Sequence, residues 1–248
     1  MVFRYGIGWV NWLTGRWPQA RALWDTVRTR WAEDAGNIYP SAGPIAAIVE
    51  IEAVGPEAGR QQLLESTARL RKTGTWRAAL WAEAYEANLW LAEGEPGKVL
   101  DGFKTILSRR PPSMLDVEDF ALTTRAVLPA ALQAADLHPL ALWIDDPGVA
   151  AAGEFYLAGV HHARAVDALL RNNHQAAEEW FGRASEIYRR LGWSTLLHEL
   201  AWQRAKTGSP AGRAAVEAAL NFYDEQGAIW RKQWLADQAG VTTSNQPA

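Results

Sequence analysis

The feature that most constrains the fold of this chain is a helix-ending residue that recurs about every 39 residues. The recurring residues are Gly15, Gly55, Gly94, Asn172 and Gly208. Their intervals are 36 to 40 residues, apart from one interval of 78 residues that predicts a further, degraded turn near Ala135. Glycine and, next best, asparagine tolerate the left-handed conformation at the end of a helix. A repeat of this period predicts helical hairpins stacked side by side.

Small and aromatic residues follow these turns in a recurring order. The clearest sets are Trp17, Ala20 and Trp24; Pro96, Val99 and Phe103; and His174, Ala177 and Phe181. Alanine lets two helix axes approach closely, since a larger side chain would hold them apart. The aromatic ring one turn later fills the space between one hairpin and its successor, and its full burial contributes about 1.5 to 3 kcal/mol. We therefore expect these residues in the core between hairpins.

The chain is expected to be all-α, because alanine, leucine, arginine and glutamate dominate and no strand pattern with a hairpin turn is present. We predict a right-handed α-solenoid of about six helical hairpins and a C-terminal capping helix, forming one domain over residues 1–238. The expected hairpins cover 1–33, 41–72, 76–110, 116–146, 152–190 and 194–226, the cap covers 228–238, and 239–248 form a flexible tail. Pro129 removes a helical hydrogen bond, so a kink or a break is expected in the fourth hairpin.

The repeated residues resemble the tetratricopeptide (TPR) motif. The matching residues are Gly8, Gly15, Trp17, Ala20 and Trp24; Gly94, Phe103 and Pro111; and Ala165, Ala177, Phe181 and Ala184. The longer unit and the Leu191-Gly192 ending are more similar to the degenerate TPR-like arrays of large bacterial regulators, the MalT-like and LuxR-type signal-transduction ATPases. This resemblance covers most of residues 1–238 and implies a helical-repeat scaffold used in bacterial signalling or transcription regulation.

Such regulators carry an ATPase module and often a DNA-binding helix-turn-helix, and neither is recognisable in this sequence. The pair Gly97-Lys98 lacks the first glycine of the phosphate-binding loop and the Ser or Thr that binds magnesium. The segment LTTRAVL at 122–128 matches the start of a LuxR-type reader, but no glycine turn and second helix follow it. We therefore expect either a piece of a longer regulator or a stand-alone array.

Composition excludes several classes of protein. The 248 residues include no cysteine, which excludes disulfides, thiolate nucleophiles and cysteine-bound zinc. The formal charge of −3 comes from acids and bases mixed along the chain, which argues against a nucleic-acid surface. No apolar run approaches the roughly 20 residues that span a bilayer, and the first residues lack a signal-peptide pattern. We expect a soluble cytoplasmic protein that binds neither nucleic acid nor membrane.

Histidines provide the candidates for catalysis or metal binding. His174 and Glu178 lie four residues apart on one helical face, and His161 and His162 lie near the start of the preceding helix. Zinc is usually held by three or four protein ligands, and no HExxH motif or carboxylate triad is present. His174 also occupies the repeat position of Trp17, where packing at the turn is expected. We therefore predict no metal, no cofactor and no catalytic residue.

Eight side chains are expected on the groove that the first helix of each hairpin lines. They are Tyr5, Trp9, Trp12, Trp81, Asn88, His162, His198 and Trp202. One interpretation is that they pack against neighbouring helices, because large exposed aromatic patches are uncommon on monomers. The other is a ligand or peptide groove with aromatic anchors. In chaperone-type TPR domains a lysine and an asparagine clamp a peptide carboxylate. The resemblance places Tyr5 and Trp9 at those positions, which disfavours a C-terminal tail as the ligand.

Three functions remain, from different classes. The first, which we favour, is a non-catalytic interaction or sensor module whose concave face binds a protein segment or a small effector. The second is a structural array whose tryptophan-rich first hairpin docks to another copy, giving a homo-oligomer, or to an ATPase domain outside this sequence. The third is a metalloenzyme that uses the histidines.

Overall fold

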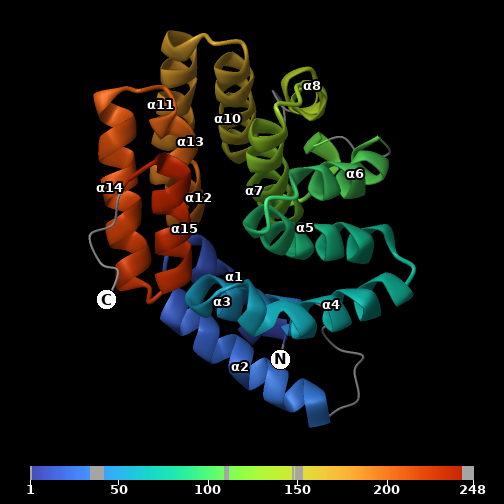
Figure 1. Cartoon of the computed structure of the whole chain (residues 1–248). Helices are drawn as coiled ribbons and strands as arrows, with labels where there is room; N and C mark the ends of the chain where they lie inside the picture. The colour runs from blue at the N-terminus through green and yellow to red at the C-terminus, as the bar shows by residue number, and fades with distance from the viewer. Residues whose placement is uncertain (1, 34–41, 109–111, 147, 149–152, 242–248) are drawn as a thin grey trace.

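The computed structural model describes residues 2–33, 42–108, 112–146, 148 and 153–241. Within these ranges the chain forms helices and no β-strand, which confirms the predicted all-α class (Figure 1). The first helices are α1 (Val2–Leu13), α2 (Trp17–Glu33), α3 (Ala42–Val54), α4 (Pro56–Lys72), α5 (Trp76–Ala92) and α6 (Pro96–Leu107). They are followed by the 3₁₀ turn η1 (Pro112–Met114), α7 (Val117–Ala134), α8 (His138–Ile144), α10 (Glu154–Leu170), α11 (His174–Arg190), α12 (Ser194–Glu199), α13 (Ala201–Ala205), α14 (Pro210–Glu225) and α15 (Ile229–Ala239). None of these described helices is both long enough and apolar enough to cross a bilayer.

Successive helices pack in pairs across tight turns. The pairs are α1 with α2, α3 with α4, α5 with α6, α7 with α8, α10 with α11, and α13 with α14. Two of the turns use a non-glycine residue with a left-handed backbone, Ala135 (φ 53°) and Asn172 (φ 58°). The degraded turn expected near Ala135 is therefore present, and Asn172 has the conformation expected of it. Residues 242–248 of the predicted tail lie outside the described residues.

The small and aromatic residues of the repeat lie in the core. Ala20 and Ala177 are completely buried, and Trp24, Phe103 and Phe181 are no more than 2% exposed. Their burial confirms the prediction that these side chains pack between helices. It also explains why the aromatic rings recur, since each hairpin buries its apolar face only against its neighbours.

Helix α7 runs through Pro129 without interruption, so the expected break is wrong. Pro129 has no N–H to donate to the carbonyl of Arg125, which weakens the helix locally. However, every residue from Asp119 to Ala131 is buried, and α7 contacts α5, α6, α8, α10 and α12. Packing against so many neighbours holds the helix together despite the missing hydrogen bond.

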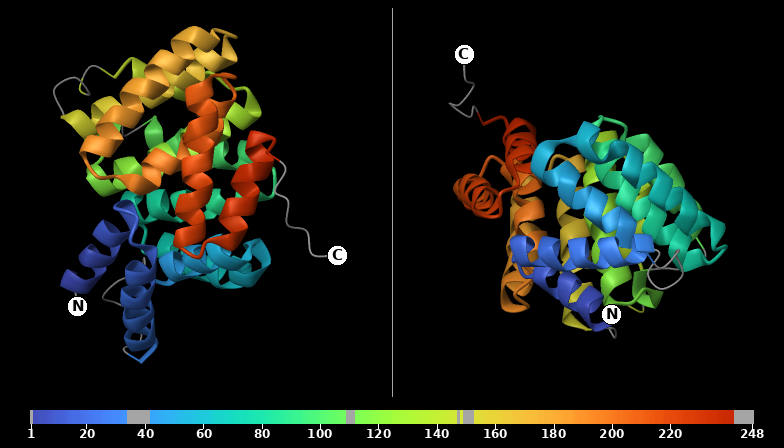
Figure 2. Two further views of the ribbon diagram at one scale, coloured as in Figure 1. Left: turned by 90° about the vertical axis from the view of Figure 1, so that its left-hand side faces the viewer. Right: turned by 90° about the horizontal axis from the view of Figure 1, so that it is seen from below.

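Helices from the N-terminal and C-terminal parts of the chain contact each other. α15 packs against α3, and α12 contacts both α1 and α7 (Figures 1 and 2). Trp17 of α2 lies edge-on against Phe222 and Tyr223 of α14, with ring centroids 5.8 and 5.5 Å apart. The Trp17 indole N–H donates to Thr195 Oγ1 of α12 at 2.9 Å. These contacts fill the space where an open concave face was expected from the sequence.

Substitution of two helical glycines by alanine would test how closely the helices pack. A Cβ atom at Gly59 of α4 would lie 2.5 Å from the Ala47 carbonyl oxygen of α3, whereas a Cβ at Gly182 of α11 would have its nearest such neighbour at 4.0 Å. We expect Gly59→Ala to lower the free energy of unfolding by about 1 to 3 kcal/mol, because backbone must shift. Gly182→Ala is expected to raise it by about 0.5 to 1 kcal/mol. Urea denaturation measures both, and equal effects would contradict the close α3–α4 approach.

Candidate functional site

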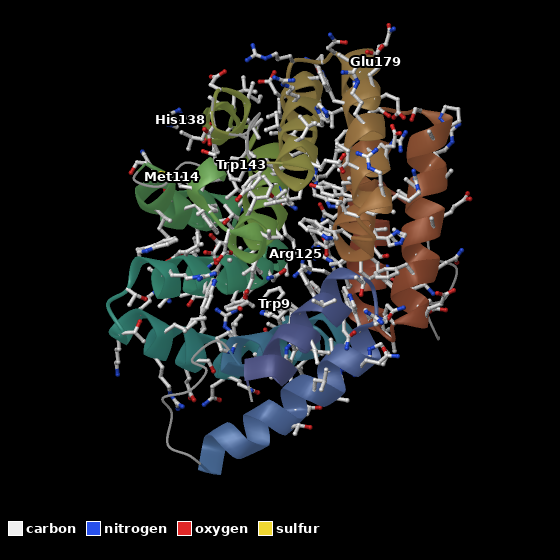
Figure 3. The ribbon with its side chains drawn as sticks, turned by 180° about the vertical axis from the view of Figure 1, so that it is seen from behind. Trp9, Met114, Arg125, His138, Trp143 and Glu179 are labelled. Atoms are coloured by element: carbon white, nitrogen blue, oxygen red, sulfur yellow. The ribbon has the colours of Figure 1, made fainter. Side chains whose placement is uncertain are left out.

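Four charged side chains are buried together where α3, α7, α12 and α15 converge. Glu52, Arg125, Glu199 and Arg231, which we name the central ionic cluster, are 1%, 5%, 2% and 4% exposed. Arg125 donates from Nε and Nη2 to Glu199 Oε1 at 3.1 and 2.9 Å, and from Nη2 to Glu52 Oε1. Arg231 Nη2 donates to the other carboxylate oxygen of Glu199. Figure 3 shows Arg125 in the middle of the molecule, near Trp9.

The two glutamates differ in how they are held. Burial would raise the pKa of Glu199, but Arg125 and Arg231 outweigh it and lower that pKa to about 2. Glu52 is bound by Arg125 through Oε1 only, and its Oε2 is buried with no hydrogen-bond partner. Burial therefore raises the pKa of Glu52, although the two arginines act against it. Glu199 is thus the anion that holds both arginines.

Aromatic rings enclose the central ionic cluster. The guanidinium carbon of Arg125 lies 4.9 Å from the Trp12 ring centroid, and that of Arg231 lies 4.1 Å from the Trp234 ring centroid. Trp9, Trp12, Tyr85 and Arg125 are among the residues that line a cavity of about 10 Å³, room for a single water molecule. At this point the interior of the protein is closely packed, and this cavity has no room for a ligand larger than water.

The eight side chains expected on the groove fall into three groups. Trp9, Trp12, Asn88, His162 and Trp202 are buried, with 6%, 3%, 8%, 3% and 0% exposed. Trp81 and His198 are partly buried, and Tyr5 belongs to α1 with a side chain outside the described residues. The expectation that the first five face an open groove is therefore corrected. These five side chains pack against neighbouring helices or their own helix instead, as Trp202 does against Trp234 and His162 does against Gln203.

The two partly buried side chains are engaged by neighbours. The Trp81 indole N–H donates to Asp119 Oδ1 at 2.6 Å, and the guanidinium carbon of Arg77 lies 5.1 Å from the Trp81 ring centroid. The His198 ring stacks on Phe222 with centroids 4.2 Å apart. The Trp81 hydrogen bond links α5 to α7 and the His198 stack links α12 to α14, as packing residues do.

His162 and Glu178 are hydrogen-bonded to side chains other than histidines. His162 Nε2 lies 3.1 Å from Gln203 Oε1, and burial lowers the pKa of His162 to about 4. Glu178 accepts hydrogen bonds from Arg204, Thr207 and Ser209, which ties α11 to the turn before α14. In the part of the chain that the structure describes, no three His, Asp or Glu side chains are placed to hold a metal ion.

An open groove lies on the outside of the array, between α2, α3 and α4. This α2–α3 groove consists of two adjoining cavities of about 400 and 230 Å³ that share Arg21, Asp25 and Val49. Trp24, Ala46, Glu50, Ala58 and Gln62 complete the lining of the larger cavity. Arg21 Nη2 donates to the Val49 carbonyl oxygen at 3.3 Å, which places the guanidinium between the two cavities. The lining of the larger cavity is mostly polar and that of the smaller cavity is mostly apolar, and a combination of both kinds of surface is typical of binding sites for peptides and small polar ligands.

Neither the central ionic cluster nor the α2–α3 groove was expected from the sequence. No family model, no curated protein and no solved structure matches the chain. One feature of the sequence does indicate these buried charges, because each charged residue of the cluster lies in a mainly apolar stretch. The four stretches are IVEIEAV, ALTTRAVL, LLHELAW and AIWRKQWL. A charge in an apolar run must find a partner or stay exposed, but the run does not identify that partner.

Matched acid-to-amide substitutions test the central ionic cluster. Glu199→Gln leaves Arg125 and Arg231 buried with one carboxylate between them, and we expect it to lower the free energy of unfolding by about 3 to 5 kcal/mol. Asp224→Asn removes the exposed ion pair with Lys232 and is expected to cost less than about 1 kcal/mol. Chemical denaturation at neutral pH measures both. A cost for Glu199→Gln as small as that of the control would show that the cluster contributes little.

Buried His162 predicts acid sensitivity. The pKa of His162 is about 4 in the folded protein, below the ordinary value of 6.5. Between these two pH values the unfolded state binds a proton at His162 and the folded state does not. The resulting stability is complete above pH 6.5 and is lost as the pH falls towards 4, by about 3 kcal/mol. We expect His162→Gln to reduce this loss in denaturation curves recorded from pH 7 to 4. His174→Gln, at the exposed start of α11, is the matched control, and an equal reduction in both variants would refute the assignment.

Proposed function

We propose that this protein is a non-catalytic, TPR-like helical-repeat module that binds a segment of a partner protein in the α2–α3 groove. The supporting observation is the contrast between two surfaces. The inner face of the array is filled by the central ionic cluster and its aromatic rings, whereas the α2–α3 groove is open over cavities of about 400 and 230 Å³. In this proposal the array is a right-handed α-solenoid whose ends are drawn together, so that recognition takes place on its outside.

The lining of the groove supports a peptide as the ligand. Trp24 is only 2% exposed and forms a rigid wall of the larger, mostly polar cavity, whereas Pro18, Ala22 and Ala53 line the smaller, mostly apolar one. Arg21 supplies hydrogen-bond donors, and Asp25 and Glu50 supply acceptors. An extended chain carries donors and acceptors along its backbone and needs both kinds of group, with apolar pockets for its side chains. A small polar effector would use the same groups.

The buried ionisable groups support a non-catalytic role. Both carboxylate oxygens of Glu199 accept hydrogen bonds from arginines, and His162 is 3% exposed beside Gln203. General acid–base catalysis requires a group within hydrogen-bond reach of a substrate. These groups face one another inside the array and are closed to a substrate. The similarity of the repeat to the arrays of bacterial regulators further supports a place in cytoplasmic signalling or transcription regulation.

Filling the groove tests the proposal. Ala58 and Ala68 are both exposed on α4, but only Ala58 lines the α2–α3 groove. For peptides selected from a random library against the wild-type protein, we expect Ala58→Trp to weaken binding about tenfold or more, which corresponds to 1.4 kcal/mol. Ala68→Trp should leave the dissociation constant unchanged. Fluorescence anisotropy with labelled peptides measures both. Unchanged affinity in Ala58→Trp, or equal losses in the two variants, would refute binding in this groove.

A further inference from the structure

A cationic patch on α10 and α11 lies apart from the α2–α3 groove. We name it the α10–α11 face, and it consists of His161, Arg164, Trp180 and Arg183. The guanidinium carbons of Arg164 and Arg183 lie 5.0 and 4.5 Å from the centroid of the Trp180 ring. The imidazole ring of His161 stacks on the same indole with centroids 5.1 Å apart. Three basic groups therefore surround one partly exposed tryptophan.

The arginines of this face differ from others that lie over tryptophan rings. Arg60, Arg77, Arg125 and Arg231 also lie over such rings, and each of these also forms an ion pair with a glutamate or an aspartate. Arg164 and Arg183 form no ion pair with any carboxylate of the described chain. Elsewhere the protein pairs a stacked arginine with an acidic side chain of its own, and on the α10–α11 face that acidic partner is missing.

The stacking prepares the two guanidinium groups for an anion. A guanidinium group held over an indole ring by cation–π attraction can still donate hydrogen bonds from its N–H groups. Those N–H groups match the two oxygens of a carboxylate and can bind it in a bidentate manner. Because Arg183 is exposed and Arg164 and Trp180 are partly exposed, a ligand can reach these groups from solvent.

The surroundings of His161 agree with an excess of positive charge. Burial first, and then the charges of Arg164 and Arg183, lower the pKa of His161 to about 4, and no carboxylate acts against them. His161 Nδ1 is buried without a hydrogen-bond partner. Leu157, one turn before His161 on α10, is 38% exposed and adds apolar surface beside the basic groups. The exposed Glu179 and Glu186 lie about one turn from Arg183 on α11, but in the described structure neither forms an ion pair with it.

We propose that the α10–α11 face binds an acidic segment of a partner protein. Carboxylates of the segment pair with Arg164 and Arg183, and an apolar residue next to them packs on Trp180 and Leu157. A nucleic-acid backbone is a poorer match, because its binding relies on many phosphate contacts and this face offers two arginines. The carboxylates of the segment would bind Arg164 and Arg183 as glutamates and aspartates of this chain bind the other arginines that lie over tryptophan rings.

A designed pair of peptides tests the proposal. The probe is a fluorescein-labelled peptide of repeated Glu-Glu-Leu units, and its control replaces each Glu by Gln. The variant is Arg164→Gln with Arg183→Gln. The matched variant is Arg189→Gln with Arg213→Gln, which removes the same charge from two exposed arginines elsewhere. Far-UV circular dichroism and thermal unfolding verify that both variants fold.

We expect the wild-type protein to bind the Glu peptide and not the Gln peptide, with an affinity that falls as salt is added. Loss of Arg164 and Arg183 should weaken binding about tenfold or more, and the matched variant should change it less than about threefold. Ala58→Trp, which fills the α2–α3 groove, should have no effect. Equal losses in the two double variants would overturn the proposal, and so would the absence of binding to the wild-type protein. Tighter, equally arginine-dependent binding of single-stranded oligothymidylate would also overturn it, in favour of a nucleic-acid ligand.

Discussion

The burial of four charges at the meeting point of four helices is the constraint on which the rest of this structure depends. Taking a carboxylate or a guanidinium out of water costs several kcal/mol per ion, so each charge must keep its partner. Glu52, Arg125, Glu199 and Arg231 come from α3, α7, α12 and α15, so the partners meet only when these four helices are placed together. We interpret the central ionic cluster as a device that selects this arrangement, since an apolar contact alone would tolerate sliding between helices.

The aromatic residues around the central ionic cluster are buried and do not line an open groove. In an open array the first helix of each hairpin would present its rings to a groove. Here the rings of Trp9, Trp12 and Trp202 are covered, and Trp12 lies over the guanidinium group of Arg125. The same side chains that suggest a ligand site in the sequence thus shield buried charges from water, which strengthens the ion pairs between them.

The two surfaces that we propose for recognition lie on different helices from the central ionic cluster, apart from α3. The α2–α3 groove and the α10–α11 face belong to helices at opposite ends of the view in Figure 1. Their chemistry also differs, because the groove combines a polar and an apolar cavity with charges of both signs, whereas the face carries two arginines. Both rest on well-packed helices, so little ordering of the protein is needed when a ligand binds.

The sequence by itself determined the local features of this protein. The helices, the left-handed turns at Ala135 and Asn172, and the burial of Ala20 and Trp24 all follow from rules that act within one or two helical turns. Only the tertiary structure decided which partners meet across the array. Glu52 and Arg125 are separated by 73 residues and Arg125 and Glu199 by 74, and no periodicity specifies such pairs. An amphipathic pattern indicates one buried face of a helix, but contacts from several sides bury nearly all of α7 and hold it intact through Pro129.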